Sequence, residues 1–121
     1  MKRFCLTVDL KDDPALIAEY EALHKKVAPE ILKSITDAGI LAMDIYRLRN
    51  RMFMIIETTD DFSFEKKSEM DLANPKVQAW EKIVQIYQQS LPWEKPDDPW
   101  KWKQMDMIFE LQAQLNPPLP L

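Results

Sequence analysis

Tyr20 and His24 are the residues of this chain whose types and spacing best suit proton-transfer chemistry. They stand four positions apart in a segment with helical spacing, so both side chains lie on one helix face. An imidazole titrates near neutrality and a phenol donates or accepts a proton, which together fit general acid–base catalysis. The same spacing is more often that of a packing tyrosine beside a surface histidine, so the residues alone leave both interpretations open.

Four tryptophans are concentrated in the second half of the chain: Trp80, Trp93, Trp100 and Trp102. Trp80 belongs to the apolar stripe of a predicted helix, and the other three lie in or near a proline-rich stretch. Flat aromatic side chains of this kind stack on the C–H faces of sugars, so Trp80 and Trp93 are candidate sugar contacts. The alternative is that the tryptophans close one end of the hydrophobic core.

Asp44 and Glu57 interrupt two apolar strand segments at interior positions. A carboxylate between apolar neighbours is exposed at an edge or held by a partner, because burying it alone is costly. A ligand with many hydroxyl groups is one such partner. An arginine such as Arg47 or Arg51 is the other, and charges on strands more often find an opposite charge than a ligand.

The chain has one cysteine, Cys5, and one histidine, and no set of metal ligands at the usual spacing. Cys5 has no internal disulfide partner, and common zinc sites need two or more His or Cys ligands. We therefore expect no metal site, with Cys5 buried in a strand and a reducing, cytoplasmic location. The first residues fit neither a signal peptide nor a membrane span, since acidic residues arrive by Asp9.

The formal net charge of −4 and the pI near 5.0 argue against nucleic acid and anionic membranes as partners, since both favour basic patches. A chain of 121 residues, of which 46% are hydrophobic, predicts one domain with a real core. We expect this domain to occupy residues 1–111, followed by a proline-rich C-terminal tail at 112–121.

Periodicity and turn residues predict the elements that position these side chains. A strand is expected at Lys2–Asp9, and Asp13 and Pro14 then cap and open a helix. Gly39, the one glycine of the chain, stands where the end of a helix needs positive φ. In Arg49–Arg51, Asn50 tolerates the left-handed conformation of a hairpin turn. Further elements are predicted at Pro29–Ala38 (helix), Ile40–Leu48 and Met52–Thr58 (strands), Asp60–Ala73 and Pro75–Gln89 (helices), and Lys101–Leu111 (strand), with a loop at Leu91–Pro99.

The order of these elements, β-α-β-β-α-β, is the ferredoxin-like pattern of an α+β fold. The two middle strands are apolar on both parities, although helices cover only one face of such a sheet. A second subunit that packs sheet to sheet would cover the other face. We therefore predict a homodimer of the dimeric α+β barrel type.

Six short segments stand in a recognisable order along the chain: Tyr20–His24 (YEALH), Val27–Ile31 (VAPEI), Asp44–Leu48 (DIYRL), Arg51–Met54 (RMFM), Asn74–Trp80 (NPKVQAW) and Met107–Phe109 (MIF). This colinear set resembles the L-rhamnose mutarotase family. The similarity covers Lys2 to Leu111, and details at Cys5–Pro14, Phe62–Lys67 and Leu91–Trp93 are closer to an L-fucose mutarotase branch.

The resemblance implies a dimeric α+β barrel without a cofactor, in which Tyr20 and His24 are catalytic and Trp80 contacts the sugar. Two positions depart from the family pattern. The rhamnose branch has a second tryptophan where this chain has Glu81, and family members usually have tryptophan where it has Ala28. The full set of expected substrate-binding residues is Trp80, Asp44, Tyr46, Glu57 and Trp93.

The resemblance implies an enzyme that interconverts the α and β anomers of a free 6-deoxy-L-sugar, with L-fucose favoured and L-rhamnose the runner-up. Ring opening removes a proton from the anomeric hydroxyl and supplies one to the ring oxygen. His24 is expected to handle one oxygen, while Tyr20 positions it or serves the other. The same scaffold also hosts cofactor-free oxygenases and ligand-binding modules, and a catalytically inactive relative is a third alternative.

Overall fold

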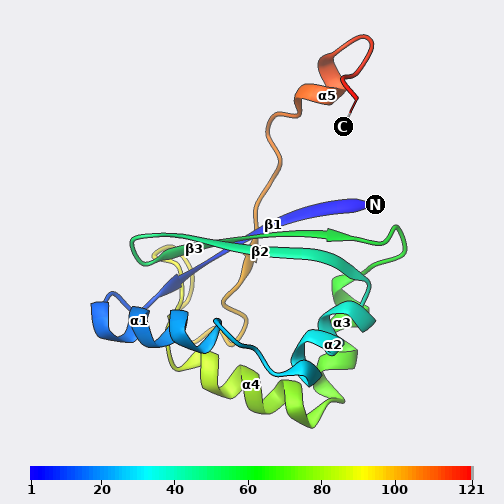
Figure 1. Cartoon of the computed structure of the whole chain (residues 1–121). Helices are drawn as coiled ribbons and strands as arrows, with labels where there is room; N and C mark the ends of the chain where they lie inside the picture. Colours follow the sequence, from blue (N-terminus) through cyan, green and yellow to red (C-terminus); the bar gives the residue numbers. More distant parts are fainter. Residues whose placement is uncertain (121) are drawn as a thin grey trace.

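The computed structural model describes residues 1–120, and Figure 1 shows an antiparallel sheet with helices packed on one side of it. Each helical connection between strands consists of two helices, because the first helix ends and a proline, Pro29 or Pro75, begins a second one. The elements are β1 Lys2–Leu10, α1 Pro14–Leu23, α2 Pro29–Asp37, β2 Ile40–Leu48, β3 Arg51–Thr58, α3 Phe64–Leu72, α4 Pro75–Gln85, β4 Gln88–Gln89, β5 Lys103–Gln104 and α5 Leu111–Gln114.

β1 lies inside the sheet because both of its edges are paired. β3 runs antiparallel along one edge and places Leu6 opposite Met54 and Val8 opposite Met52. The other edge is shared by two short strands, β4 at the end of β1 and β5 near its middle. β2 pairs with the far side of β3, which gives the order β2-β3-β1-β4, with β5 also on β1.

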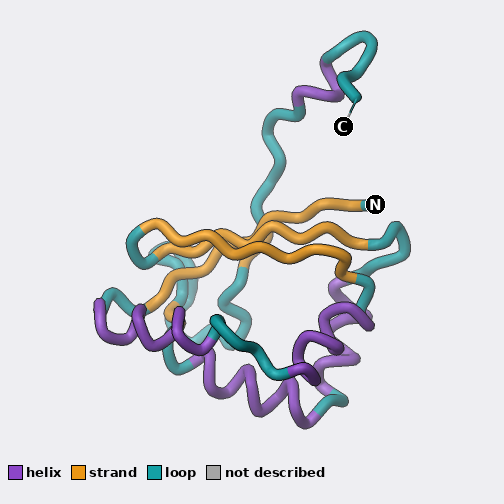
Figure 2. The backbone as a smooth tube through the Cα atoms, viewed as in Figure 1, coloured by secondary structure: helices purple, strands orange, loops and turns teal. Residues whose placement is uncertain are grey.

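Alternate strand residues build the core between the sheet and the helices, which lie on one side of the sheet (Figure 2). Val8, Leu10 and Met52 pack with Tyr20 of α1 and Val84 of α4 in one cluster. Burial of these side chains is the main contribution to the stability of the layer that holds the helices. A second cluster toward the other end of the strands consists of Leu6, Ile40, Ile56 and Phe62.

The opposite side of the sheet, which we call the outer face, is covered by no helix of the described chain (Figure 2). Register places Tyr46 beside Phe53, and both point away from the core residues that flank them. Tyr46 and Leu48 are 59% and 72% exposed. The outer face consists of Cys5, Thr7, Ala42, Asp44, Tyr46, Leu48, Phe53 and Ile55.

Local signals act as predicted at most helix ends. The Asp13 carboxylate accepts hydrogen bonds from two backbone N–H groups of the first turn of α1, and Pro14 opens the helix. Gly39 follows α2 with φ of 95°, which confirms the need for glycine there. The hairpin turn differs: Arg49, not Asn50, has positive φ, at 54°. The Asn50 amide instead donates to the Leu10 carbonyl at 3.0 Å, which fixes it in the other turn position.

Three predicted element boundaries were wrong. α3 begins at Phe64 rather than Asp60, because the chain turns at Thr59–Asp61 and Ser63 caps the helix. α4 ends at Gln85 rather than Gln89, because the backbone at Gln88–Gln89 pairs with β1. The last strand, expected at Lys101–Leu111, is limited to Lys103–Gln104, and the residues after it leave the sheet.

The α+β class and the ferredoxin-like order are confirmed by this topology. The loop predicted at Leu91–Pro99 is also confirmed, since it contains no regular element. Within residues 1–120, no helix is both long enough and apolar enough to cross a membrane.

Candidate functional site

Tyr20 and His24 come together at the end of α1, as their spacing predicts. The centroids of their rings are 4.4 Å apart and the ring planes are inclined by 32°. Tyr20 is 4% exposed and belongs to the core, whereas His24 caps the helix and is half-buried. The helix therefore presents a buried phenol directly beside an imidazole that ligands can reach.

One hydrogen bond determines which imidazole nitrogen of His24 is available. Nδ1 lies 2.9 Å from the backbone carbonyl oxygen of Tyr20. A carbonyl oxygen only accepts hydrogen bonds, so Nδ1 carries the hydrogen and donates it. In the neutral ring Nε2 then has a free lone pair, which is the atom of a general base.

The Tyr20 hydroxyl lies in a different environment. Burial raises its pKa above the ordinary value of 10.0, and the contact from Gln88 opposes this only in part. The Gln88 amide approaches the phenol oxygen at 3.5 Å as a donor. Tyr20 therefore stays protonated at neutral pH, and its O–H hydrogen remains available to donate to another acceptor.

Trp80 joins this pair from α4. Its ring centroid is 5.3 Å from that of His24, with the planes inclined by 63°. Asn74 positions the helix by accepting hydrogen bonds from its first turn, and Pro75 opens it. His24 thus stands between Tyr20 and Trp80, which gives the cluster one polar edge surrounded by aromatic surface.

Two further residues of the cluster were missed in the sequence. Tyr87 packs edge-on against Tyr20 with ring centroids 6.0 Å apart. Gln88 is buried beside the Tyr20 hydroxyl. Both were assigned to the end of a helix, and only the pairing of β4 with β1 brings them to the site. β4 consists of only two residues, which is too short for an alternating pattern that would predict its pairing with β1.

The other four expected sugar contacts do not lie with His24. Asp44 and Tyr46 are exposed on the outer face, and Glu57 lies on the same side of the sheet. Trp93 is 65% exposed, and the Arg51 guanidinium lies 5.2 Å from its ring centroid. Within one subunit the sheet separates Asp44, Tyr46 and Glu57 from the cluster on α1 and α4.

The arginine partners also differ from expectation. Glu57 accepts a hydrogen bond from Arg3 at 2.9 Å, not from Arg47 or Arg51. Arg51 donates two hydrogen bonds, at 2.8 and 3.2 Å, to the buried carboxylate of Asp9. Arg47 extends toward α1 instead. An arginine partner is thus confirmed for Glu57, where register selects Arg3, whereas Asp44 forms no ion pair within residues 1–120.

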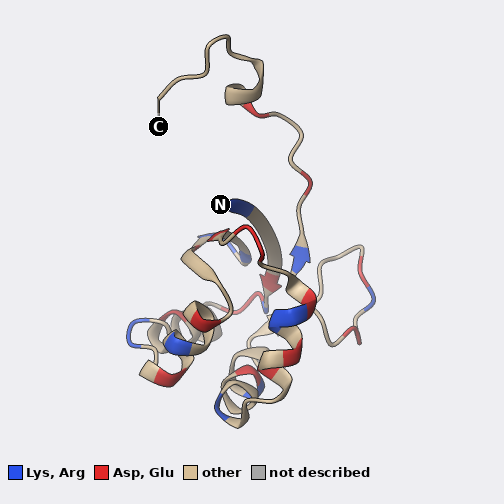
Figure 3. Ribbon diagram, turned by 90° about the vertical axis from the view of Figure 1, so that its right-hand side faces the viewer, with Lys and Arg blue, Asp and Glu red and all other residues tan. Residues whose placement is uncertain are grey.

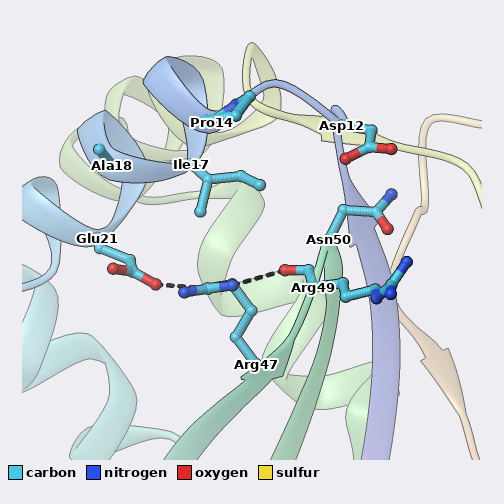
Figure 4. A pocket seen from close by; sticks show the side chains of 8 residues that line it. All are labelled: Asp12, Pro14, Ile17, Ala18, Glu21, Arg47, Arg49 and Asn50. Atoms are coloured by element: carbon cyan, nitrogen blue, oxygen red, sulfur yellow. Dashed lines mark hydrogen bonds and ion pairs between the residues drawn. The ribbon is translucent and has the colours of Figure 1, made fainter.

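Arg47 pairs with Glu21 across an open cleft between α1 and the β2–β3 hairpin (Figure 4). The cleft has a volume of about 530 Å³, which lies in the usual range for small-molecule pockets. Ile17 lines it and also packs against the core cluster that contains Tyr20, but neither Tyr20 nor His24 is among the lining residues. The lining residues are Asp12, Pro14, Ile17, Ala18, Glu21, Arg47, Arg49 and Asn50.

Among the described residues, no group of three or more His, Cys, Asp or Glu side chains is placed to hold a metal ion. The chemistry that the cluster offers is proton transfer at His24 Nε2, hydrogen-bond donation from Tyr20, and an aromatic surface at Trp80.

Comparison with known proteins assigns the chain to a family. A model of the L-rhamnose mutarotase family matches residues 3–111. The chain belongs to the L-rhamnose mutarotase family. A curated relative, an L-fucose mutarotase of Xanthomonas campestris pv. campestris, is 37% identical over 118 residues, which cover 96% of this chain and 93% of that protein. A UPF0734 protein of Dictyostelium discoideum is 31% identical over 117 residues, with 91% and 90% covered.

Solved structures share the fold of this L-rhamnose mutarotase family member. A crystal structure of an L-rhamnose mutarotase from Formosa agariphila superimposes with a TM-score of 0.66 at 17% identity, over 92% of this chain and 99% of that one. Tetracenomycin F2 cyclase from Streptomyces glaucescens gives 0.56 at 18% identity, over 91% and 96%. At these identities the likeness concerns the fold.

The two departures from the family pattern, Ala28 and Glu81, lie at the start of α2 and within α4. Ala28 precedes α2, is exposed and caps the helix with no side-chain hydrogen bond. Glu81 follows Trp80 on α4 and is half-buried. Burial, and secondarily the nearby Asp71 carboxylate, raise the pKa of Glu81. The charged neighbours of Glu81 are Asp71 and Lys67 of α3, so this acid of raised pKa lies toward α3 rather than in the Tyr20–His24–Trp80 cluster.

Proposed function

We propose that this protein interconverts the α and β anomers of a free 6-deoxy-L-sugar, with L-fucose as the preferred substrate. One observation carries the proposal: His24 has its Nε2 lone pair free beside the neutral, buried phenol of Tyr20. The reaction needs a base and a hydrogen-bond donor and no cofactor. Membership of the L-rhamnose mutarotase family and the L-fucose mutarotase relative support it.

His24 carries the proton in the proposed mechanism. Nε2 takes the proton from the anomeric hydroxyl as that oxygen becomes the carbonyl of the aldehyde. The electron pair of the C1–O5 bond moves to the ring oxygen, which receives the proton back from Nε2. Rotation about C1–C2 presents the other face of the aldehyde, and the same transfers in reverse close the ring. One such group contributes about 10²–10⁴ in rate.

Tyr20 acts as a neutral hydrogen-bond donor in this mechanism. Its raised pKa makes it a poor acid for complete transfer, so it is suited to stabilise negative charge that develops on a sugar oxygen. Trp80 supplies the apolar surface on which the sugar ring stacks. Burial of the C6 methyl group contributes on the order of 1 kcal/mol, so hydroxyl geometry must supply most of the sugar preference.

We propose further that the protein is a homodimer with its outer faces in contact. Exposed apolar residues such as Tyr46 and Leu48 on a sheet without a helical cover support this. Asp44 and Glu57, which lie on the side of the outer face, then belong to the subunit interface rather than to the sugar site. A cytoplasmic location fits a chain whose single Cys5 is a free thiol.

Exchange NMR tests the enzymatic proposal. The rate of exchange between the α and β H1 signals of L-fucose is measured with and without protein, and L-rhamnose and D-glucose are compared. Wild-type protein should accelerate exchange of L-fucose most, and His24→Ala should reduce the acceleration about 10²–10⁴-fold. Added imidazole should restore part of the activity of His24→Ala. Lys26→Ala, an exposed position nearby, is the matched control and should keep the wild-type rate.

Two results would count against the proposal in different ways. Exchange no faster than in buffer for every sugar would refute the activity. Full activity of His24→Ala would refute the role of His24 while leaving the activity intact. A larger acceleration for L-rhamnose than for L-fucose would show that L-rhamnose is the preferred sugar.

A further inference from the structure

Gln88 is a buried polar side chain to which the proposed mechanism gives no role. It is 5% exposed and stands opposite Leu10 in the pairing of β4 with β1. Its neighbours Leu10 and Tyr20 belong to the apolar core cluster with Val8, Met52 and Val84. Figure 3 shows that charged residues of both signs are spread over the helices and connecting segments instead. A buried amide in apolar surroundings is costly unless it has a polar partner.

The polar partner of this amide is the phenol of Tyr20. Within residues 1–120, the one side-chain hydrogen bond of Gln88 joins Nε2 to the Tyr20 hydroxyl oxygen at 3.5 Å. A contact of this length is weak, so it stabilises the fold less than an apolar side chain of the same size would. Stability therefore does not explain a glutamine at this position.

The polarity of the contact determines the direction of the Tyr20 hydrogen. An amide N–H only donates, so the phenol oxygen accepts from Gln88 with a lone pair. A phenol hydrogen favours two positions in the ring plane, and the one nearer the amide is disfavoured because two positively polarised hydrogens repel. The Tyr20 hydroxyl therefore donates away from Gln88. Burial raises the pKa of Tyr20 and the hydrogen bond from Gln88 lowers it in part, as expected of a donor to the phenol oxygen.

We propose that Gln88 is a positioning residue of the sugar site, whose amide turns the Tyr20 hydroxyl so that its hydrogen points to the sugar. This role rests on the proposed anomer exchange, in which Tyr20 donates to a sugar oxygen, and Gln88 acts through that hydroxyl. A donor that is already oriented needs no reorganisation when negative charge develops, and this is the source of its effect on rate.

Gln88→Met removes the amide donor and keeps the length of the side chain. Exchange NMR of L-fucose should show a rate about 3- to 10-fold lower than that of the wild type, the effect of one ordinary hydrogen bond. The urea midpoint of unfolding should stay the same or rise, because an apolar group replaces a buried amide. Gln89→Met is the matched control: Gln89 is the exposed neighbour on the same strand, so this variant should keep the wild-type rate.

Gln88→Glu reverses the polarity of the contact at the same size. At about pH 9, far above the ordinary pKa of a glutamate, the carboxylate accepts the Tyr20 hydrogen and withdraws it from the sugar. The rate should fall about 10²–10³-fold, as it does when an oriented donor is lost. In the Tyr20→Phe background the same substitution should cause no further loss, because no hydroxyl is left to turn. An equal loss in both backgrounds would indicate structural damage and would overturn the proposal.

A measurement without catalysis tests the contact itself. The ¹³Cζ chemical shift of Tyr20 in the labelled full-length chain should change in Gln88→Met and stay at its wild-type value in Gln89→Met. An unchanged shift in Gln88→Met would refute the proposal.

The outcomes separate the two linked proposals. A wild-type protein that accelerates anomer exchange of no sugar refutes the proposed function and, with it, the role of Gln88 in that reaction. An active wild-type protein whose Gln88→Met and Gln88→Glu variants keep the full rate refutes the role of Gln88 alone.

Discussion

Replacement of Tyr20 by Phe isolates the hydroxyl group that the mechanism uses as a neutral donor. The ring stays in place, and its contacts with His24 and Tyr87 are preserved. The lost hydrogen bond is the 3.5 Å contact from Gln88, which is long for such a bond. The free energy of unfolding should therefore change by no more than about 1 kcal/mol.

The effect on catalysis should be much larger. Removal of a donor aimed at developing negative charge usually costs about 10²–10³ in rate, or roughly 3–4 kcal/mol. Because burial raises the Tyr20 pKa above 10.0, the hydroxyl is protonated over the whole assay range. Tyr20→Phe should thus lower the exchange rate by the same factor from about pH 5 to pH 9, without changing the shape of the profile.

Exchange NMR of L-fucose at several pH values measures this factor after the rate in buffer is subtracted. Tyr87→Phe is the matched control, since it removes a hydroxyl from a tyrosine of the same cluster. We expect Tyr87→Phe to retain the wild-type rate. If Tyr20→Phe keeps its rate within about threefold, or if Tyr87→Phe loses as much, then the hydroxyl of Tyr20 is not the donor.

Three further predictions concern stability, measured by urea unfolding. Glu81→Gln should stabilise the fold at neutral pH, because the raised pKa means that the native state disfavours the charged acid; this gain should disappear as the pH falls below about 4, where the acid is neutral in both states. Gly39→Ala should cost about 1–3 kcal/mol, since φ is 95° and a new Cβ would lie 2.8 Å from Thr59 Oγ1; a neutral result would show that the turn relaxes. Arg51→Met should cost about 3 kcal/mol because it leaves the buried Asp9 unpaired, and adding Asp9→Leu should recover part of that loss.

The core elements could be predicted because their signals are local. Alternation in β1 and the Asp13–Pro14 helix start each depend on residues that are adjacent in sequence. The final strand could not be placed in the same way. Alternation in Lys101–Leu111 shows that the segment can form a strand, but not which edge it pairs with. In one subunit that segment pairs with β1 only around Lys103–Met105.

The candidate site divides along the same line. The contact between Tyr20 and His24 follows from helical spacing, because two residues four positions apart lie on the same helix face. Gln88 reaches the Tyr20 hydroxyl only through the pairing of β4 with β1, which is a tertiary contact. The hairpin makes a similar point: Arg49 has positive φ, and the Asn50 side chain instead donates to the carbonyl of Leu10, which is 40 positions away in sequence.

Residues of the outer face are therefore expected to influence catalysis only through assembly. Tyr46 is 59% exposed and lies across the sheet from His24, so its side chain cannot contact a sugar bound at the α1–α4 cluster of the same subunit. We expect Tyr46→Ala to weaken the dimer and to leave the exchange rate per subunit unchanged at concentrations where the dimer still forms. A decrease in rate without a change in sedimentation would instead place Tyr46 in contact with the sugar, as the sequence analysis expected. That comparison decides whether this family member completes its sugar site within one subunit or between two.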